Sequence, residues 1–136
     1  MMTTNRKKLF ASFNGNAPAS TAAISQFEKE TGICLPEAYK QFLQHADGGE
    51  GFIGQGAYII LWRVEELLEM NNAYQVSEYA HGLLIFGSDG GGEAFAFDMR
   101  SDLKPIVSVP FVGMDLRLAR SLAPTFDRFL NQLANL

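Results

Sequence analysis

The chain has 136 residues, a net charge of −4 and 47% hydrophobic residues, which is typical of one globular domain. Its single cysteine, Cys34, excludes an internal disulfide and a multi-cysteine metal site. No apolar run approaches the roughly 18 residues that a membrane span needs, so the sequence predicts a cytoplasmic protein with no membrane partner.

The charge is unevenly distributed along the chain. Residues 37–102 contain eleven acidic and three basic side chains, whereas the two ends together contain four acidic and eight basic ones. Nucleic-acid binding needs a basic footprint, so this acidic middle argues against a nucleic-acid partner. It is compatible with a basic protein partner or with an acidic surface that only keeps the protein soluble.

The N-terminal third predicts two helices. Residues 1–17 are expected to form an arm or a short helix, and a single domain is expected over residues 18–136. Ser20 or Thr21 can cap a first helix that ends before Gly32, which suits a left-handed C-cap. A second helix is predicted from Pro36. Cys34, between the two helices, is predicted to be a small buried hydrophobe.

The middle of the chain predicts a strand, a helix and a central hairpin. The strand covers residues 57–62, and the short acidic helix covers residues 64–70 and ends at two asparagines. Between residues 82 and 98, two apolar runs enclose the turn sequence GSDGGG, which is typical of a β-hairpin with an irregular turn.

The C-terminal third predicts another strand over residues 105–111, an ambiguous stretch over 114–122 and an amphipathic helix over 124–133. The order of elements predicts an α+β fold, with a mainly antiparallel sheet centred on the hairpin and helices packed on it.

No pattern of catalytic or metal-binding residues emerges. Residues 49–54 match GxGxxG, but a helix precedes them and a strand follows, which is the reverse of a dinucleotide site. Asp89, Glu93 and Asp98 cluster along the hairpin, where turn and solvent roles compete with acid–base chemistry or cation binding. Trp62 is either a core anchor or a partner contact. No catalytic residue, metal or cofactor is therefore assigned, and the protein is not expected to be an enzyme.

Two segments and the C-terminus together resemble one known family. ISQFEKETGICLPEAYKQFLQHADGG resembles the opening of the SUKH superfamily, LLIFGSDGGGEAFAFD its central hairpin and ARSLAPTFDRFLNQL its closing helix. Asp47 stands where the family commonly has Asn. The signature positions are Phe27, Glu28, Gly32, Leu35, Pro36, Tyr39, Phe42, Leu43, Gly87, Asp89, Gly90, Gly92, Glu93, Phe95 and Asp98.

The resemblance implies an α+β domain without established catalytic residues. Bacterial members are mostly immunity proteins that neutralise a toxin domain, often a nuclease, and fungal members are scaffolds in cell-wall regulation. The leading hypothesis is an immunity protein that binds a basic toxin domain through an acidic surface. A regulatory scaffold and a small-ligand binder at the hairpin loop are the alternatives. The predicted partner-binding residues are Asp47, Glu50, Trp62, Asp89, Glu93 and Asp98.

Overall fold

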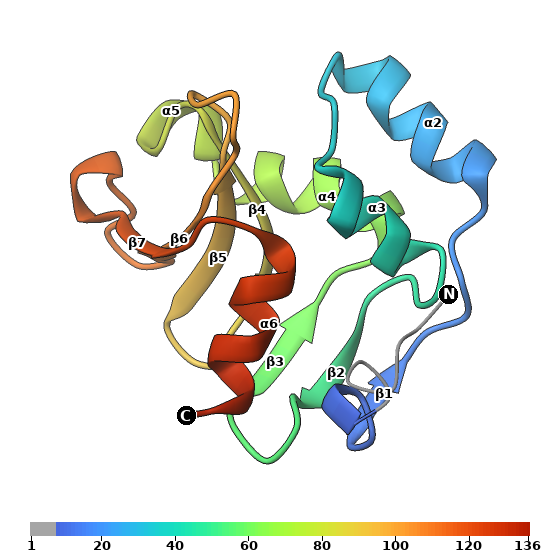
Figure 1. The fold of residues 1–136 in the computed structure, drawn as a ribbon. Helices are drawn as coiled ribbons and strands as arrows, with labels where there is room; N and C mark the ends of the chain where they lie inside the picture. Colours follow the sequence, from blue (N-terminus) through green and yellow to red (C-terminus); the bar gives the residue numbers. More distant parts are fainter. Residues whose placement is uncertain (1–7) are drawn as a thin grey trace.

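A seven-stranded antiparallel sheet forms the centre of the protein, which a computed structural model describes over residues 8–136 (Figure 1). The strands lie in the sheet in the order of the chain, so each strand pairs with the next. The strands are β1 (Phe13–Gly15), β2 (Gly49–Phe52), β3 (Tyr58–Leu61), β4 (Leu83–Ser88), β5 (Glu93–Asp98), β6 (Ile106–Pro110) and β7 (Arg120–Ala123).

Helices occupy the connections between these strands and the C-terminus. The α-helices are α2 (Thr21–Thr31), α3 (Glu37–Leu43), α4 (Val64–Ala73), α5 (Val76–Tyr79) and α6 (Phe126–Ala134), and a 3-10 turn, η1, spans Leu116–Leu118. The predicted α+β class and antiparallel sheet are confirmed. Strands β4 and β5, on either side of residues 89–92, pair with each other near the middle of the sheet.

Aromatic rings fill the space between the sheet and the helices α3 and α6. Phe86 of β4 stacks on Phe97 of β5 with ring centroids 4.3 Å apart. Tyr39 of α3 contacts both rings, and Phe126 of α6 contacts Tyr39 at 5.3 Å. All four side chains are almost fully buried. Because burying each large aromatic side chain stabilises the fold by a few kcal/mol, this cluster holds both helices firmly to the sheet.

The helix ends follow the local sequence. The Ser20 hydroxyl accepts a hydrogen bond from the Ala23 N–H, and Gly32 ends α2 in the left-handed region with φ 71°, as predicted. Helix α4 runs three residues beyond the predicted end, through both asparagines. Residues 76–79 form α5, a short helix that the sequence did not predict.

The two edge strands β1 and β2 correct the sequence interpretation. Residues 13–15, inside the predicted arm, form β1, and Gly49–Phe52, part of the stretch that matches GxGxxG, form β2. A Cβ on Gly49 would overlap the carbonyl oxygen of Asn14, and one on Gly51 that of Ser12, so these glycines permit two backbones to approach closely. They do not form a nucleotide-binding loop. Residues 1–7 of the predicted arm lie outside the described residues.

Cys34 also differs from its prediction, since its side chain is exposed. The connection between α2 and α3 is extended, so its neighbour Leu35 is buried while Cys34 points outward.

Candidate functional site

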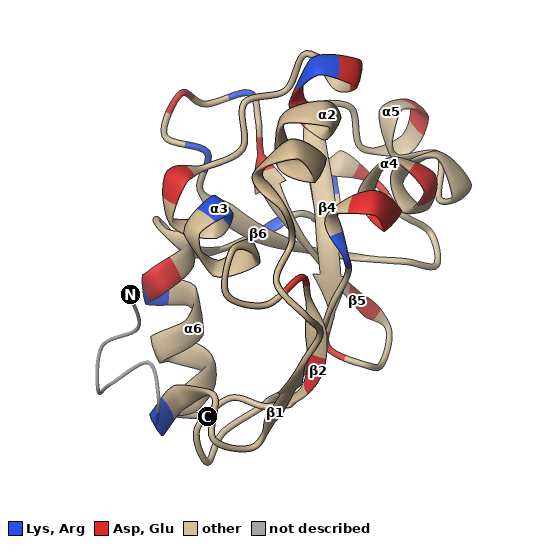
Figure 2. Ribbon diagram, turned by 90° about the vertical axis from the view of Figure 1, so that its right-hand side faces the viewer, with Lys and Arg blue, Asp and Glu red and all other residues tan. Residues whose placement is uncertain are grey.

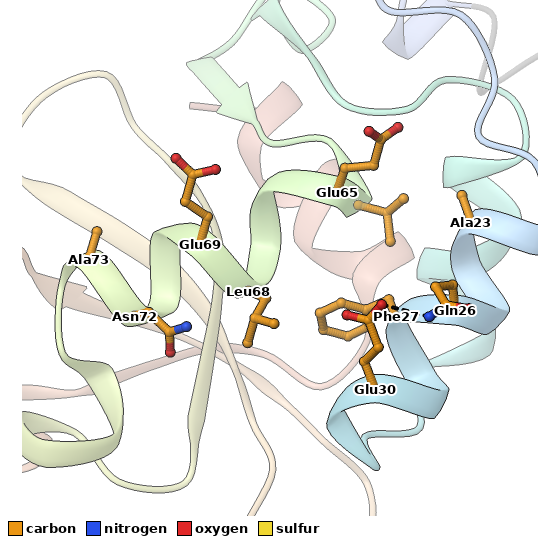
Figure 3. A pocket seen from close by; sticks show the side chains of 10 residues that line it. Ala23, Gln26, Phe27, Glu30, Glu65, Leu68, Glu69, Asn72 and Ala73 are labelled. Carbon is orange, nitrogen blue, oxygen red and sulfur yellow. Dashed lines mark hydrogen bonds between the residues drawn. The ribbon is translucent and has the colours of Figure 1, made fainter.

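A groove of about 870 Å³ lies between α2 and α4. One stripe of each helix lines it, at the spacing of one helical face. The stripe of α2 contains Ala23, Gln26, Phe27 and Glu30, and that of α4 contains Val64, Glu65, Leu68, Glu69, Asn72 and Ala73 (Figure 3). These two stripes together are called the α2–α4 groove below.

The α2–α4 groove has an apolar floor and an acidic rim. Phe27 is buried at its base, and Leu68 remains 41% exposed above it. Glu30, Glu65 and Glu69 are exposed along the rim, and no Lys or Arg lines the groove. Within residues 8–136, none of these three carboxylates forms an ion pair. Figure 2 shows that α4 and α5 carry acidic side chains without a basic one. The groove therefore presents uncompensated negative charge beside apolar surface.

A second hollow of about 350 Å³ lies beside this groove, toward the start of β4. Phe27, Glu30, Leu68 and Asn72 line both cavities, so the two adjoin each other. Beyond them the lining includes Val76, His81 and Met99.

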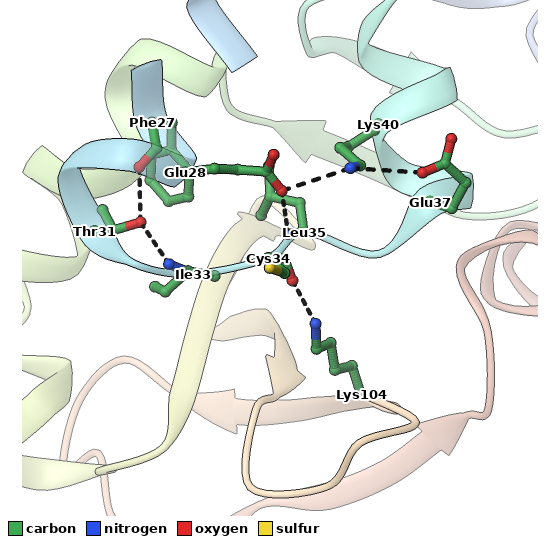
Figure 4. Close-up of polar contacts among 9 residues, drawn as sticks. All are labelled: Phe27, Glu28, Thr31, Ile33, Cys34, Leu35, Glu37, Lys40 and Lys104. Atoms are coloured by element: carbon green, nitrogen blue, oxygen red, sulfur yellow. Dashed lines mark hydrogen bonds and ion pairs between the residues drawn. The ribbon is translucent and has the colours of Figure 1, made fainter. Parts of the chain in front are cut away.

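The position of α2 is fixed by Glu28 on its opposite side (Figure 4). The Glu28 carboxylate accepts a hydrogen bond from the Leu35 N–H at 2.7 Å and lies 3.6 Å from the Lys40 ammonium. Lys104 donates to the Cys34 carbonyl at 2.5 Å. These contacts tie α2 to α3 and to the loop before β6. The Phe27–Glu28 pair of the family signature thus has one residue in the groove and one in its support.

The position of α4 is fixed at both ends by side chains. At its start, the Val64 N–H donates to the carboxylate of Asp47 at 2.8 Å. Near its end, the Asn71 amide donates to the Ile85 carbonyl and accepts from the Ile85 N–H, both at 2.9 Å. Strand β3 pairs with β4 only at Gly87 and Ser88. Asn71 therefore takes the place of a missing strand partner, a role that the sequence interpretation missed.

Asp47 is a buried residue of the fold. It is 7% exposed, and burial raises the pKa of its carboxyl above the ordinary value, with a further contribution from the charge of Glu65. The Val64 N–H opposes this change. Asp47 was predicted as a partner contact, but its carboxylate points into the protein and caps α4. It can act on the groove only by holding that helix.

Three other predicted residues gather at the opposite end of the sheet. The Tyr58 hydroxyl donates to Glu50, and this bond raises the pKa of Tyr58. Tyr58, Asp89 and Glu93 line one cavity beside α6. Asp89 also accepts hydrogen bonds from the Gly91 and Glu93 N–H groups, so it shapes the hairpin turn.

The remaining two predicted residues do not join this group. Asp98 lies at the other end of β5, where a two-point contact with Arg100 lowers the pKa of its carboxyl. Trp62 is 9% exposed and packs near Phe111, with ring centroids 6.4 Å apart. The six predicted residues therefore form no single surface, whereas the α2–α4 groove contains none of them.

Among residues 8–136, no group of three or more His, Cys, Asp or Glu side chains is arranged to hold a metal ion. No helix in the same part of the chain is long and apolar enough to cross a membrane.

Comparison with known proteins gives two matches. The model of the SMI1 / KNR4 family (SUKH-1) matches residues 18–132. A protein of Bacillus subtilis (strain 168), described as "Uncharacterized protein YnaB", is 32% identical over 77 residues. This match covers 57% of the present chain and 49% of the relative, so it spans about half the relative's length.

Proposed function

Because the chain belongs to the SMI1 / KNR4 family (SUKH-1), we propose that it is a non-enzymatic immunity protein that binds a basic toxin domain through the α2–α4 groove. The observation that carries the proposal is the unpaired acidic rim of Glu30, Glu65 and Glu69 beside exposed Leu68. A toxin that acts on nucleic acid needs a basic cleft, since it must contact phosphates. The rim and such a cleft are complementary in charge.

The groove has the shape for an inserted segment rather than a flat contact. Its two walls are helices of 11 and 10 residues, which corresponds to about 15 Å of length. A segment of the partner can place apolar side chains on Phe27 and Leu68 while its Lys or Arg side chains reach the rim. Inhibition follows from occlusion, because a basic surface held in this groove is no longer available to its substrate.

The charges are expected to act mainly on the rate of association. Long-range attraction between oppositely charged surfaces accelerates encounter and weakens as salt is added. The affinity of the complex should therefore fall with ionic strength through a slower association rate, while the dissociation rate depends on apolar contacts at Phe27 and Leu68.

Affinity capture from native cells at low salt, followed by mass spectrometry, is the first test. We expect one stoichiometric partner with a basic, nuclease-like domain. The double variant Glu65→Gln/Glu69→Gln should slow association with that partner by about tenfold. Glu78→Gln/Asp102→Asn removes the same charge at exposed positions outside the groove and should have a much smaller effect. If both variants slow association equally, the effect comes from the net charge of the protein and not from the groove.

The hairpin end of the sheet offers a second comparison. Asp89→Asn/Glu93→Gln tests the surface that the sequence predicted for the partner. If only this variant weakens the complex, the groove assignment is wrong while the immunity function stands. Many substoichiometric partners, indifferent to all three variants, would instead favour the alternative of a regulatory scaffold.

A further inference from the structure

A cavity of about 540 Å³ lies between α6 and strands β5 to β7, at the opposite end of the molecule's sheet from the α2–α4 groove. Its floor is apolar, with Phe95 of β5 and Phe129 of α6 in edge-to-face contact at 4.8 Å. Leu133 completes this floor, and all three side chains are buried. The volume is within the range of small-ligand sites.

The strand register places polar groups on the same face as this floor. Phe95 pairs with Ser108 of β6, and Ser108 pairs with Arg120 of β7. Directly paired residues of neighbouring strands point to the same side of a sheet. Glu93, two residues before Phe95, shares that side. The cavity thus has a carboxylate on one side, a guanidinium on the other and a hydroxyl between them.

These groups are not used by the protein itself. Ser108 is 5% exposed, yet within the described part of the chain its hydroxyl has no hydrogen-bond partner. Arg120 forms no ion pair with Glu93 or Asp89 in that same part. Ser108 lines the cavity, so its hydroxyl is available to a ligand that enters.

We propose that this cavity binds an apolar α-amino acid. The ammonium group would lie at Glu93 and Asp89, the carboxylate at Arg120 and Ser108, and the apolar side chain on Phe95 and Phe129. Strands β5 and β7 are two strand spacings apart, roughly 10 Å, so the two charged side chains can reach a small headgroup from both sides. A zwitterion satisfies both charges at once, which an anion or a cation alone does not.

Binding is measured by titrating the ¹⁵N-labelled protein in NMR experiments with L-phenylalanine, 3-phenylpropionate and 2-phenylethylamine. The three probes share a phenyl ring, and the last two each lack one charge. L-Phenylalanine should shift the amide signals of residues 90–93, Ser108 and Arg120, and should bind at least about tenfold more tightly than the other two. L-Leucine serves as a second amino-acid probe.

Two variants that each remove one charge separate the contributions. Arg120→Met should weaken L-phenylalanine to the level of 2-phenylethylamine and leave 2-phenylethylamine unchanged. Glu93→Gln should show the mirror pattern with 3-phenylpropionate. An unshifted background spectrum verifies folding in each case. The proposal fails if neither amino acid shifts the cavity signals, or if all three phenyl probes bind equally. Either result is independent of the toxin-binding proposal, which concerns the α2–α4 groove.

Discussion

The aromatic core and the α2–α4 layer are held together in different ways. In the core, rings from α3, β4, β5 and α6 are fully buried against one another, and the Tyr39 hydroxyl is left without a hydrogen-bond partner in the described chain. In the α2–α4 layer, the two helices contact each other beside an open groove, and three side chains, Glu28, Asp47 and Asn71, fix the helices through hydrogen bonds to backbone groups.

This difference shows how the protein keeps a face open. Apolar burial packs elements closely but has no preferred direction, so the spacing of two helices beside a groove depends on additional contacts that fix their positions. Hydrogen bonds from side chains to specific backbone groups act at a fixed distance and direction. They can therefore place two helices side by side without closing the surface between them.

The largest expected effect is on the core. Phe86→Ala removes a ring that packs against three elements. We expect the free energy of unfolding to fall by about 3–5 kcal/mol in urea denaturation, because the cavity cannot collapse. A loss below about 1 kcal/mol would mean that this cluster does not anchor the two helices.

Asn71→Ala should have the largest effect in the α2–α4 layer. It leaves the N–H and the carbonyl of Ile85 without their partner, and we expect a loss of about 1–3 kcal/mol. Asn72→Ala, one residue along the same helix and exposed, is the matched control. Both variants are measured by urea denaturation. Equal losses of stability would contradict the inference that the Asn71 side chain replaces a strand partner of Ile85.

Glu28→Ala is expected to cost less, about 1–2 kcal/mol, because it removes one hydrogen bond to a backbone N–H and a partly exposed contact with Lys40. Its neighbour on the rim, Glu30→Ala, should change stability by less than about 0.5 kcal/mol. The comparison is made by thermal unfolding. Equal losses of stability for the two variants would mean that the Glu28 contacts do not fix the position of α2.

Asp47→Asn should give the smallest change at neutral pH, since an amide oxygen can still accept from Val64. Its effect depends on pH. Burial raises the native pKa of Asp47, so the native state binds the proton more tightly than the unfolded chain, whose pKa is about 3.9. As pH falls through the raised value, wild type should gain stability relative to Asp47→Asn. The measurement is urea denaturation of both proteins from neutral to acid pH. If wild type instead loses stability relative to Asp47→Asn as pH falls, the hydrogen bond from Val64 outweighs burial and the native pKa of Asp47 is lowered.

The sequence predicts elements best where one local rule decides. Ser20 and Gly32 bound α2 through capping chemistry, and the apolar spacing of α6 places four residues of one face in the core. Strands β1 and β2 were missed because Gly49 and Gly51 are typical of loops. These glycines permit contact between two backbones that are 36 residues apart in sequence, as in the pair Asn14 and Glu50, and no local sequence pattern indicates such a contact.

The sequence predicts the candidate site less well than the fold. The sequence predicted Asp89 and Asp98 because they are carboxylates near turns. The groove, in contrast, forms only when α2 and α4, which are separate in sequence, come together in the fold. Asn71 was interpreted as a helix terminator, because its true partner lies on β4. One signal was present in the sequence. Glu65, Leu68, Glu69 and Asn72 share a helical face, and a face with two carboxylates beside a leucine is unusual for one that packs inward.

The order of the strands also has a consequence for folding kinetics. Strands β4 to β7 follow one another through connections of four to nine residues, whereas β1 reaches β2 only after α2 and α3, and β3 reaches β4 after α4 and α5. Short loops close at a lower entropic cost, so we expect the nucleus to contain β4 to β6. Phe86→Ala should then slow folding, whereas Asn71→Ala should mainly accelerate unfolding, and stopped-flow measurements on both variants would separate the two. The helices that border the groove are therefore expected to pack last during folding and to unfold first.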